Sequence, residues 1–251
     1  MTASKILLLG EGPQSEEVAH WLTDQGDEVV RFSETLEDYS SADVVIEVIR
    51  DSTLRQLALA HVETMISEQI PIFVSGLTAY VAEVASWLKY PQRVSGFQPW
   101  LLTSMDVLEV IRPLQMEQEE QWLRATLFWQ ERGKQVEQVD DCPGMVFPRI
   151  LAMVVNEASF ALGEGVASAK DIDIAMKHGT NYPFGPLEWA DRIGLDEIIS
   201  VLQGMHVHLG EDAYRPAPLL QKLTYAKRFG QSSGRGFYSY LAQTDGQGAA
   251  H

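Results

Sequence analysis

A glycine-rich turn near the N-terminus is the first place where residue types and spacing suggest chemistry. Gly10 and Gly12 follow the apolar run Ile6–Leu9 and precede a helix-forming stretch. In the G-x-G-x-x-G pattern of dinucleotide-binding folds, such glycines allow a tight turn and a close approach to a pyrophosphate. Ser15 stands where the third glycine belongs and adds bulk where helix and strand pack closely. The two glycines also suit an ordinary strand-to-helix turn, so both interpretations remain open.

Several residues around this turn oppose a bound pyrophosphate. Pro13 has no backbone N–H to donate. Glu11, Glu16 and Glu17 bring negative charge to the loop, although acids in a first helical turn also stabilise the helix dipole. The acid that commonly binds the ribose about 20 residues further on is replaced by Ser33, and an acid, Glu34, follows one position late. We therefore expect dinucleotide binding to be weak or lost.

The elements that must position this loop follow from the pattern of apolar residues. Through the first 141 residues, short apolar runs alternate with amphipathic stretches. The expected strands are residues 6–9, 28–32, 43–49, 71–75, 93–97, 106–112 and 135–139. The expected helices are residues 15–25, 53–67, 78–88 and 117–132. Strand–helix alternation with unbroken apolar strands predicts a mostly parallel α/β sheet.

The pattern changes after Cys142. From there the expected elements are all helices, at residues 145–163, 168–179, 187–193, 196–209 and 218–229. Ser168, with Asp171 three residues later, forms a capping box at the start of the second of these helices. We therefore predict two domains, an α/β domain over residues 1–141 and an all-helical domain over residues 142–251.

Composition and charge exclude several classes of protein. The chain has 251 residues and a formal net charge of −16. Residues 1–141 carry 10 basic and 24 acidic side chains, a charge of −14, and residues 142–251 carry 9 and 11, a charge of −2. Without a basic cluster or a long apolar run, we expect no nucleic-acid partner, no membrane partner and no signal segment. One cysteine excludes an internal disulfide framework, so we expect a cytoplasmic protein, and we expect no metal.

Four motifs in the second half of the chain follow one another in a characteristic order. They are DCPGMVFPRI at residues 141–150, EGVASAKDID at 164–173, YPFGPLEWAD at 182–191 and SGRGFY at 233–238. This set resembles the 3-hydroxyacyl-CoA dehydrogenases, including 3-hydroxybutyryl-CoA dehydrogenases, with a more eroded similarity over residues 1–112. The resemblance implies an abbreviated Rossmann-like domain of the NAD-binding type. It also implies a helical domain that forms a homodimer and half of an acyl-CoA cleft.

The resemblance also implies where catalytic residues should lie, and the sequence departs from the family there. The family's general base is a histidine that begins a His-aromatic-aromatic-Asn-Pro run; matched to residues 95–99, this places Ser95 at the base position. Its partner glutamate is retained as Glu109, two residues further away than in the family, which indicates an insertion within residues 100–104. The substrate-contacting serine is retained as Ser75, although a serine here also suits helix capping. Pro148 replaces the family's asparagine.

The chain is also shorter than the family between the second and third expected strands. Only residues 33–42 connect them, where the family has a helical region and a further strand. Ten residues span at most about 33–36 Å, which is enough to return along one strand and cross its neighbour. We therefore expect a sheet without the strand on the adenine side, a further reason for weak NAD binding.

Three functions remain open. A serine does not hold a proton reversibly near pH 7, and no histidine lies near Ser95 in sequence, so we favour a pseudoenzyme that keeps the dimeric scaffold and an acyl-CoA cleft without efficient hydride transfer. The second is an active NAD-dependent 3-hydroxyacyl-CoA dehydrogenase of fatty-acid or related acyl-CoA metabolism. The third is a non-catalytic interaction module whose cleft is filled by Trp100, Leu101 and Leu102. We expect these three residues to be buried in the core of their own domain instead.

Overall fold

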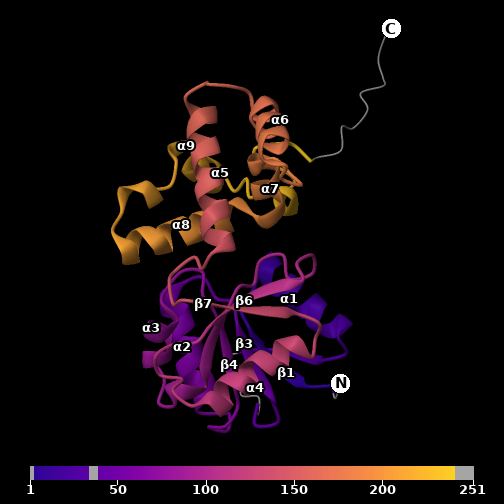
Figure 1. Ribbon diagram of the computed structural model, residues 1–251, viewed down its shortest axis with the longest axis vertical. Coiled ribbons are helices and arrows are strands. Elements are labelled where there is room, and N and C mark those ends of the chain that lie inside the picture. The colour runs from indigo at the N-terminus through magenta and orange to yellow at the C-terminus, as the bar shows by residue number, and fades with distance from the viewer. Residues whose placement is uncertain (1–2, 34–38, 241–251) are drawn as a thin grey trace. The chain divides into compact units, whose positions relative to one another are not determined.

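The computed structural model describes residues 3–33 and 39–240 (Figure 1). Packing divides the chain into unit 1, residues 1–150 and 200–214, and unit 2, residues 151–199 and 215–251. Residues 200–214, which the sequence assigns to the helical domain, therefore pack with unit 1. The last described strand ends at Val139, and helices follow it. The predicted fold class, an α/β part followed by a helical part, is confirmed.

Unit 1 is built on a seven-stranded sheet. The strands are β1 (Lys5–Leu9), β2 (Glu28–Arg31), β3 (Val44–Glu47), β4 (Ile72–Ser75), β5 (Val94–Phe97), β6 (Val107–Ile111) and β7 (Gln135–Val139). Their order is β2-β1-β3-β4-β5-β6-β7. Every neighbouring pair is parallel except β5 and β6, which are antiparallel. The prediction of a mostly parallel sheet is therefore confirmed, and each predicted strand overlaps an observed one.

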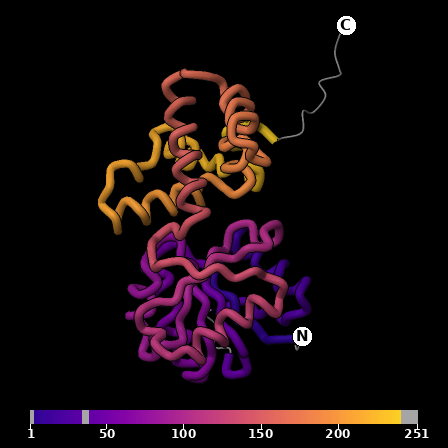
Figure 2. Tube along the Cα trace, viewed as in Figure 1, coloured from indigo at the N-terminus to yellow at the C-terminus, as the bar shows by residue number. Residues whose placement is uncertain are grey.

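Four helices cover the two faces of this sheet. They are α1 (Pro13–Asp24), α2 (Ser52–Glu63), α3 (Val81–Ser86) and α4 (Glu119–Gln130). Ile6 and Leu8 of β1 join the apolar cluster that contains residues of α1 and α4, whereas Leu7 and Leu9 join the cluster that contains residues of α2 and α3. Because successive side chains of a strand point to opposite faces, α1 and α4 cover one face and α2 and α3 the other (Figure 2). This explains why the strand is apolar at consecutive positions.

The sheet ends at β2. β1 pairs with β2 on one side and with β3 on the other, so the chain crosses β1 between these two strands. Phe32 extends the pairing by one residue, because its N–H donates to the carbonyl of Leu8 at 3.0 Å. Residues 34–38 of the connection lie outside the described residues. Among the described residues, β2 is the edge strand of the sheet.

Unit 2 is helical. The helices of the second half of the chain are α5 (Phe147–Gly163), α6 (Ala169–Thr180), α7 (Pro186–Ile193), α8 (Leu195–Leu209) and α9 (Pro218–Tyr225). The predicted capping box is confirmed, because the Ser168 Oγ accepts the N–H of Asp171 at 3.2 Å and donates to its carboxylate at 2.6 Å. Asn156 of α5 fixes the segment before α9, since its Oδ1 accepts the N–H of Ala217 at 2.7 Å. Across the described residues, we find no helix with the length and apolar character needed to span a bilayer.

Candidate active site

The carboxyl ends of the parallel strands define the place where a ligand can bind in unit 1. In open α/β sheets, ligands bind outside these ends where the strand order reverses, which here is between β1 and β3. Gly10 follows β1, Glu47 ends β3 and Ser75 ends β4. The sequence-predicted residues Gly10 and Ser75 therefore lie at the same edge of the sheet.

The backbone of the glycine loop is open to a ligand. Gly10 has φ 123° and Gly12 has φ 90°, a region that side-chain-bearing residues rarely adopt. Gly12 is the N-cap of α1 and has no side chain to occupy the helix end. A Cβ placed on Gly12 would meet no other atom within 4 Å. This geometry fits the close approach of a pyrophosphate to a helix N-terminus.

Ser15 does not disturb the packing that the third glycine normally allows. It is fully buried, and its hydroxyl donates to the carbonyl of Gly10 at 2.8 Å. The serine side chain therefore links the first turn of α1 to the start of the glycine loop. The bulk that the serine adds at the contact of helix and strand is accommodated within that interface.

The acids of the first helical turn do not crowd the loop as the sequence suggests. The Glu16 carboxylate lies 2.9 Å from the guanidinium of Arg31, which ends β2. Glu17 turns toward the segment after β5, where its carboxylate accepts the N–H of Thr103 at 3.2 Å. Burial raises the pKa of Glu17, against the opposing effect of that hydrogen bond. Two of the three negative charges are therefore engaged, and the residues present fit a dinucleotide.

Ser95 does not lie where a general base would be needed. It is in the interior of β5, paired with Phe73 of β4. Its side chain is fully buried, and its hydroxyl has no hydrogen-bond partner among the described residues. The Ser95 side chain is therefore enclosed within the sheet, where it is in no position to act as a general base.

Gln98 is the residue that faces Glu109. In the antiparallel pair, Gly96 lies opposite Ile111 and Phe97 opposite Val110, and the Gln98 N–H donates to the Glu109 carbonyl at 3.1 Å. Directly opposed residues of an antiparallel pair project from the same face. Gln98 lies 11 residues before Glu109 and Ser95 lies 14 before it, so the family spacing, which is two residues shorter than that of Ser95, matches neither. The residue opposite Glu109 in this strand pair is therefore an amide.

The carboxylate of the retained Glu109 also binds backbone N–H groups at the N-terminus of a helix. The Glu109 carboxylate accepts the N–H groups of Val146 and Phe147, at 2.8 and 2.7 Å, at the start of α5. Burial raises the pKa of this carboxyl, and the two N–H donors oppose that shift. Pro148 lies in the first turn of α5, where its missing N–H costs nothing, but it offers no polar side chain in place of asparagine.

A buried ion pair supports Ser75, and the sequence did not reveal it. Glu47 and Arg55 are 0% and 1% exposed, and Arg55 Nε lies 2.7 Å from the Glu47 carboxylate. Arg55 also donates to the Ser75 carbonyl at 2.6 Å. Burial raises the pKa of Glu47, and the charge of Arg55 opposes this. The pair therefore connects α2 with the ends of β3 and β4.

The described histidines belong to helices and not to the strands or the loops that follow them. Five of them lie on helices: His20, His61, His178, His206 and His208. His251 falls outside the described residues. Trp100 and Leu102 of the segment after β5 are buried as expected, at 2% and 1% exposed, whereas Leu101 is half-buried.

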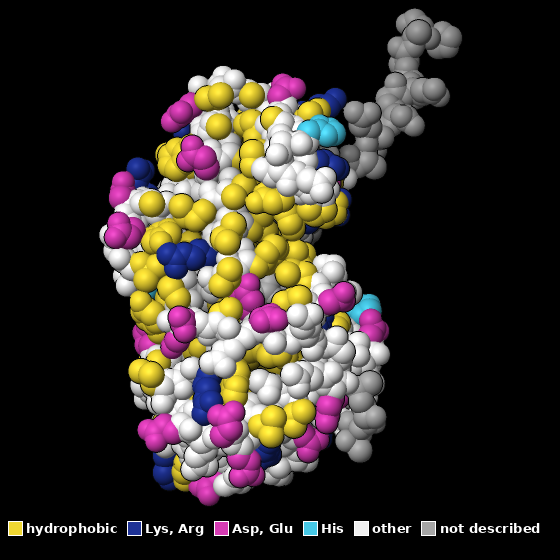
Figure 3. Space-filling view, in the orientation of Figure 1, with side chains coloured by type: hydrophobic (Ala, Val, Ile, Leu, Met, Phe, Trp, Pro, Cys, Tyr) yellow, Lys and Arg dark blue, Asp and Glu magenta, His cyan; other side chains and the backbone are white. Residues whose placement is uncertain are grey.

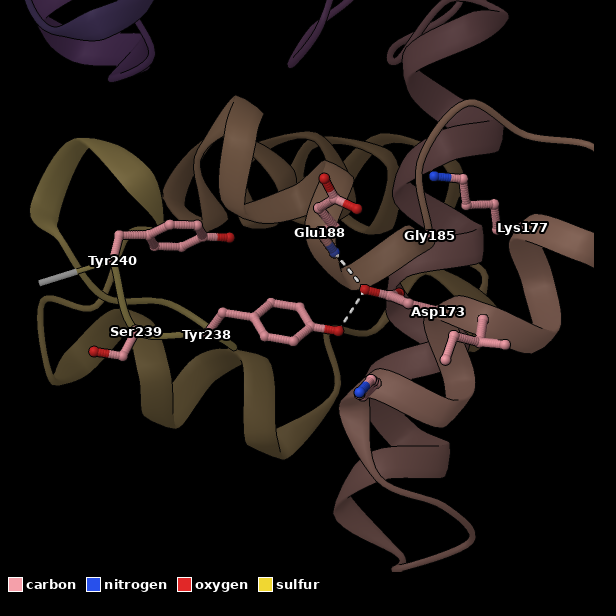
Figure 4. A pocket seen from close by; sticks show the side chains of 9 residues that line it. Asp173, Lys177, Gly185, Glu188, Tyr238, Ser239 and Tyr240 are labelled. Carbon is pink, nitrogen blue, oxygen red and sulfur yellow. Dashed lines mark hydrogen bonds between the residues drawn. The ribbon is translucent and has the colours of Figure 1, made fainter. Parts of the chain in front are cut away.

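Unit 2 holds a separate cavity of about 500 Å³ beside α6. In its wall, the Asp173 carboxylate accepts the N–H groups of Leu187 and Glu188, at 2.8 and 2.9 Å, and the hydroxyl of Tyr238 at 2.6 Å (Figure 4). Burial raises the pKa of Tyr238, and Asp173 adds to the shift. Lys177 extends from α6 on the other side of Asp173 (Figure 4). The motif residues of this unit therefore join α6, α7 and the segment around Tyr238.

Comparison with known sequences identifies relatives over most of the chain. The sequence model of the 3-hydroxyacyl-CoA dehydrogenase, C-terminal domain, matches residues 144–240. The probable 3-hydroxybutyryl-CoA dehydrogenase of Bacillus subtilis is 38% identical over 219 residues, which are 86% of this chain and 75% of that protein. The 3-hydroxyadipyl-CoA dehydrogenase of Escherichia coli is 46% identical over 99 residues, 39% of this chain and 21% of that protein.

Solved structures agree with these sequence relationships. The crystal structure of (S)-3-hydroxybutyryl-CoA dehydrogenase PaaH1 from Ralstonia eutropha matches with a TM-score of 0.77 and 26% identity, covering 95% of this chain and 99% of that one. The crystal structure of Mycobacterium tuberculosis FadB2 matches with a TM-score of 0.83 and 24% identity, which supports the fold alone. On the sequence identity and coverage together, the chain belongs to the 3-hydroxyacyl-CoA dehydrogenase family.

Proposed function

We propose that this protein keeps the dinucleotide-binding loop and the substrate-site frame of its family but oxidises or reduces acyl-CoA substrates only slowly. The observation that carries the proposal is the amide of Gln98, which stands opposite Glu109 in the β5–β6 pair. Its Nε2 donates to the carbonyl of Trp100 at 2.8 Å, so the side chain is held by its own loop. Ser75 is the last residue of β4, and Glu109 is the central residue of β6.

The missing group is the proton acceptor. Oxidation of a 3-hydroxyl removes a hydride from carbon and a proton from oxygen, and NAD, when bound, accepts the hydride. An amide such as that of Gln98 does not take up a proton near pH 7. Loss of a positioned general base lowers the rate by about 10²–10⁴-fold. Glu109 does not replace it, because its carboxylate already accepts two backbone N–H groups at the start of α5.

The retained loop changes the prediction for the cofactor. The sequence suggested that NAD binding is weak or lost, but the open Gly12 backbone and the paired Glu16 support retention of a nicotinamide dinucleotide. Binding and turnover are then separable properties of this chain. A binding measurement tests the loop, and a rate measurement tests Gln98.

The test is a comparison of acetoacetyl-CoA reduction by the wild type and by Gln98→His. The replacement puts an imidazole opposite Glu109. We expect the rate to rise by about tenfold or more, which is part of the about 10²–10⁴-fold that is lost with a positioned general base. Ser95→His is the matched control, because it adds the same imidazole at the buried interior of β5 and should not raise the rate. Circular dichroism verifies that each variant folds. A wild-type turnover in the ordinary enzymatic range of about 1–10³ s⁻¹ overturns the proposal.

That outcome would support the second candidate, an active dehydrogenase. The specific observation in its favour is the 38% identity to a protein of Bacillus subtilis called a probable 3-hydroxybutyryl-CoA dehydrogenase. In that case another group would accept the proton, and Gln98→His would leave the rate unchanged or lower it. The same assay therefore separates the two candidates.

A homodimer is part of the proposal. Apolar side chains gather on the visible face of the helical region (Figure 3). On α5, Ile150 is 54% exposed, and Met153, Val154 and Phe160 are half-buried. Exposed apolar surface of this kind marks interaction sites. Light scattering after gel filtration should give twice the mass of 28.0 kDa, and a monomer contradicts this part of the proposal.

A further inference from the structure

Arg31 places a positive charge beside the glycine loop. It is the last residue of β2, and its guanidinium donates to the Ser15 hydroxyl and lies 2.9 Å from the Glu16 carboxylate. Its side chain is 37% exposed, so it remains accessible to a ligand from solvent. Both contacts are to the first turn of α1, the same turn that Gly12 caps.

The end of the second strand is where Rossmann-type folds distinguish the two nicotinamide dinucleotides. An acid near this point binds the free 2′-hydroxyl of the adenosine ribose in NAD, whereas an arginine accommodates the 2′-phosphate of NADP. This chain has Ser33 where the acid is expected and Arg31 two residues before it. The two-residue period of extended backbone places these side chains on one face. The residue types therefore fit a phosphate rather than a hydroxyl.

The contacts of Arg31 leave it able to bind a phosphate. A guanidinium has five N–H donors, and its planar fork binds phosphate through two parallel hydrogen bonds. Glu16 is 74% exposed, and an exposed ion pair of this kind contributes little to stability. A 2′-phosphate can therefore displace Glu16 at small cost, while the Ser15 hydroxyl keeps the guanidinium beside the loop.

We propose that Arg31 binds the 2′-phosphate of NADP(H), so that the protein binds NADP(H) more tightly than NAD(H). The inference rests on the retained dinucleotide loop of the proposed function and adds the choice of cofactor. It does not depend on turnover, because the binding of either dinucleotide can be measured without substrate.

The experiment is calorimetric titration of the wild type with NADPH and, separately, with NADH. We expect NADPH to bind about tenfold or more tightly, because a charge-assisted pair of hydrogen bonds is added. Arg31→Gln should lose this difference through weaker NADPH binding alone. Glu16→Gln should act in the opposite direction, because it removes the carboxylate that competes with the phosphate. Arg124→Gln is the control, an exposed arginine of α4 whose replacement should leave both affinities unchanged.

The outcomes separate this inference from the proposed function. Equal affinities for NADPH and NADH, or an NADPH affinity that Arg31→Gln leaves unchanged, overturn the role of Arg31. They leave the rate test on Gln98 untouched. If neither dinucleotide binds, both this inference and the retained loop are wrong. A preference for NADPH that Arg31→Gln abolishes and Glu16→Gln enhances supports the inference.

Discussion

Arg55→Met tests whether the buried ion pair holds the carboxyl ends of β3 and β4 in place. Methionine keeps most of the apolar stem of arginine but removes the charge that faces Glu47. Glu47 is completely buried, so its carboxylate has no access to water once Arg55 is gone. The change also removes the donor that Arg55 gives to the Ser75 carbonyl at 2.6 Å.

The expected cost is large. Removing one partner of a buried pair destabilises a protein by about 3–5 kcal/mol. The lost hydrogen bond to the Ser75 carbonyl adds about 1–3 kcal/mol. The total is comparable with the whole stability of a domain, about 5–15 kcal/mol. The double variant Glu47→Gln/Arg55→Met removes both charges, and it should recover a large part of this loss.

The assay is urea unfolding followed by tryptophan fluorescence. Five of the six tryptophans lie in unit 1, namely Trp21, Trp87, Trp100, Trp122 and Trp129, so the signal reports mainly on the unit that contains the pair. Glu119→Gln is the control, because the Glu119 side chain is 78% exposed in its ion pair with Arg112. Its loss should cost no more than about 1 kcal/mol.

The pH dependence identifies the cause of the loss. In Arg55→Met, burial acts on Glu47 without compensation and raises the pKa of its carboxyl further. The cost of the buried charge is then present above that raised pKa and is relieved as the pH falls through it. The stability deficit should therefore shrink as the pH falls through the raised pKa of Glu47. A deficit below about 1 kcal/mol, or one independent of pH, refutes the reasoning.

Three other changes test further contacts of the fold. Because burial raises the pKa of Glu109, the wild type should gain stability relative to Glu109→Gln as the pH falls through that pKa; Tm differences that stay constant with pH contradict this. Asp191→Ala leaves the N–H groups of Phe237 and Tyr238 without their buried acceptor, which should cost roughly 2–5 kcal/mol of stability. Trypsin should then cleave the C-terminal segment faster, and an unchanged cleavage rate counts against this prediction. Ser168→Ala removes the cap of α6 and should cost about 1 kcal/mol in thermal unfolding, with no change if the cap contributes nothing.

The sequence predicts the elements of this fold well because its signals are local. Strands buried on both faces carry apolar residues at consecutive positions, and β3 is an example, because it begins with the buried residues Val44, Val45 and Ile46. The capping box at Ser168 needs only residues within one helical turn. Both patterns depend on neighbours in sequence, so no knowledge of the tertiary structure was required.

The site was less predictable because its contacts are distant in sequence. Glu16 looked like an unpaired acid until the fold brought Arg31 to it from β2. Glu17 similarly turned toward Thr103, which is 86 residues away. From the local sequence alone these acids have no visible partner, whereas the folded chain brings a partner to each of them. A count of local charges therefore leaves out the partners that offset the charge of Glu16 and fix the side chain of Glu17.

The residue opposite Glu109 was not predictable from the sequence for a related reason. The family's motif matches the base position to Ser95, which is 14 residues before Glu109, and no local pattern marks Gln98. Only the antiparallel register of β5 and β6 puts Gln98 opposite Glu109 and leaves Ser95 inside the sheet. A buried serine within a strand says nothing about catalysis, whereas under the proposed function the amide opposite Glu109 stands where a group that takes up the proton is needed.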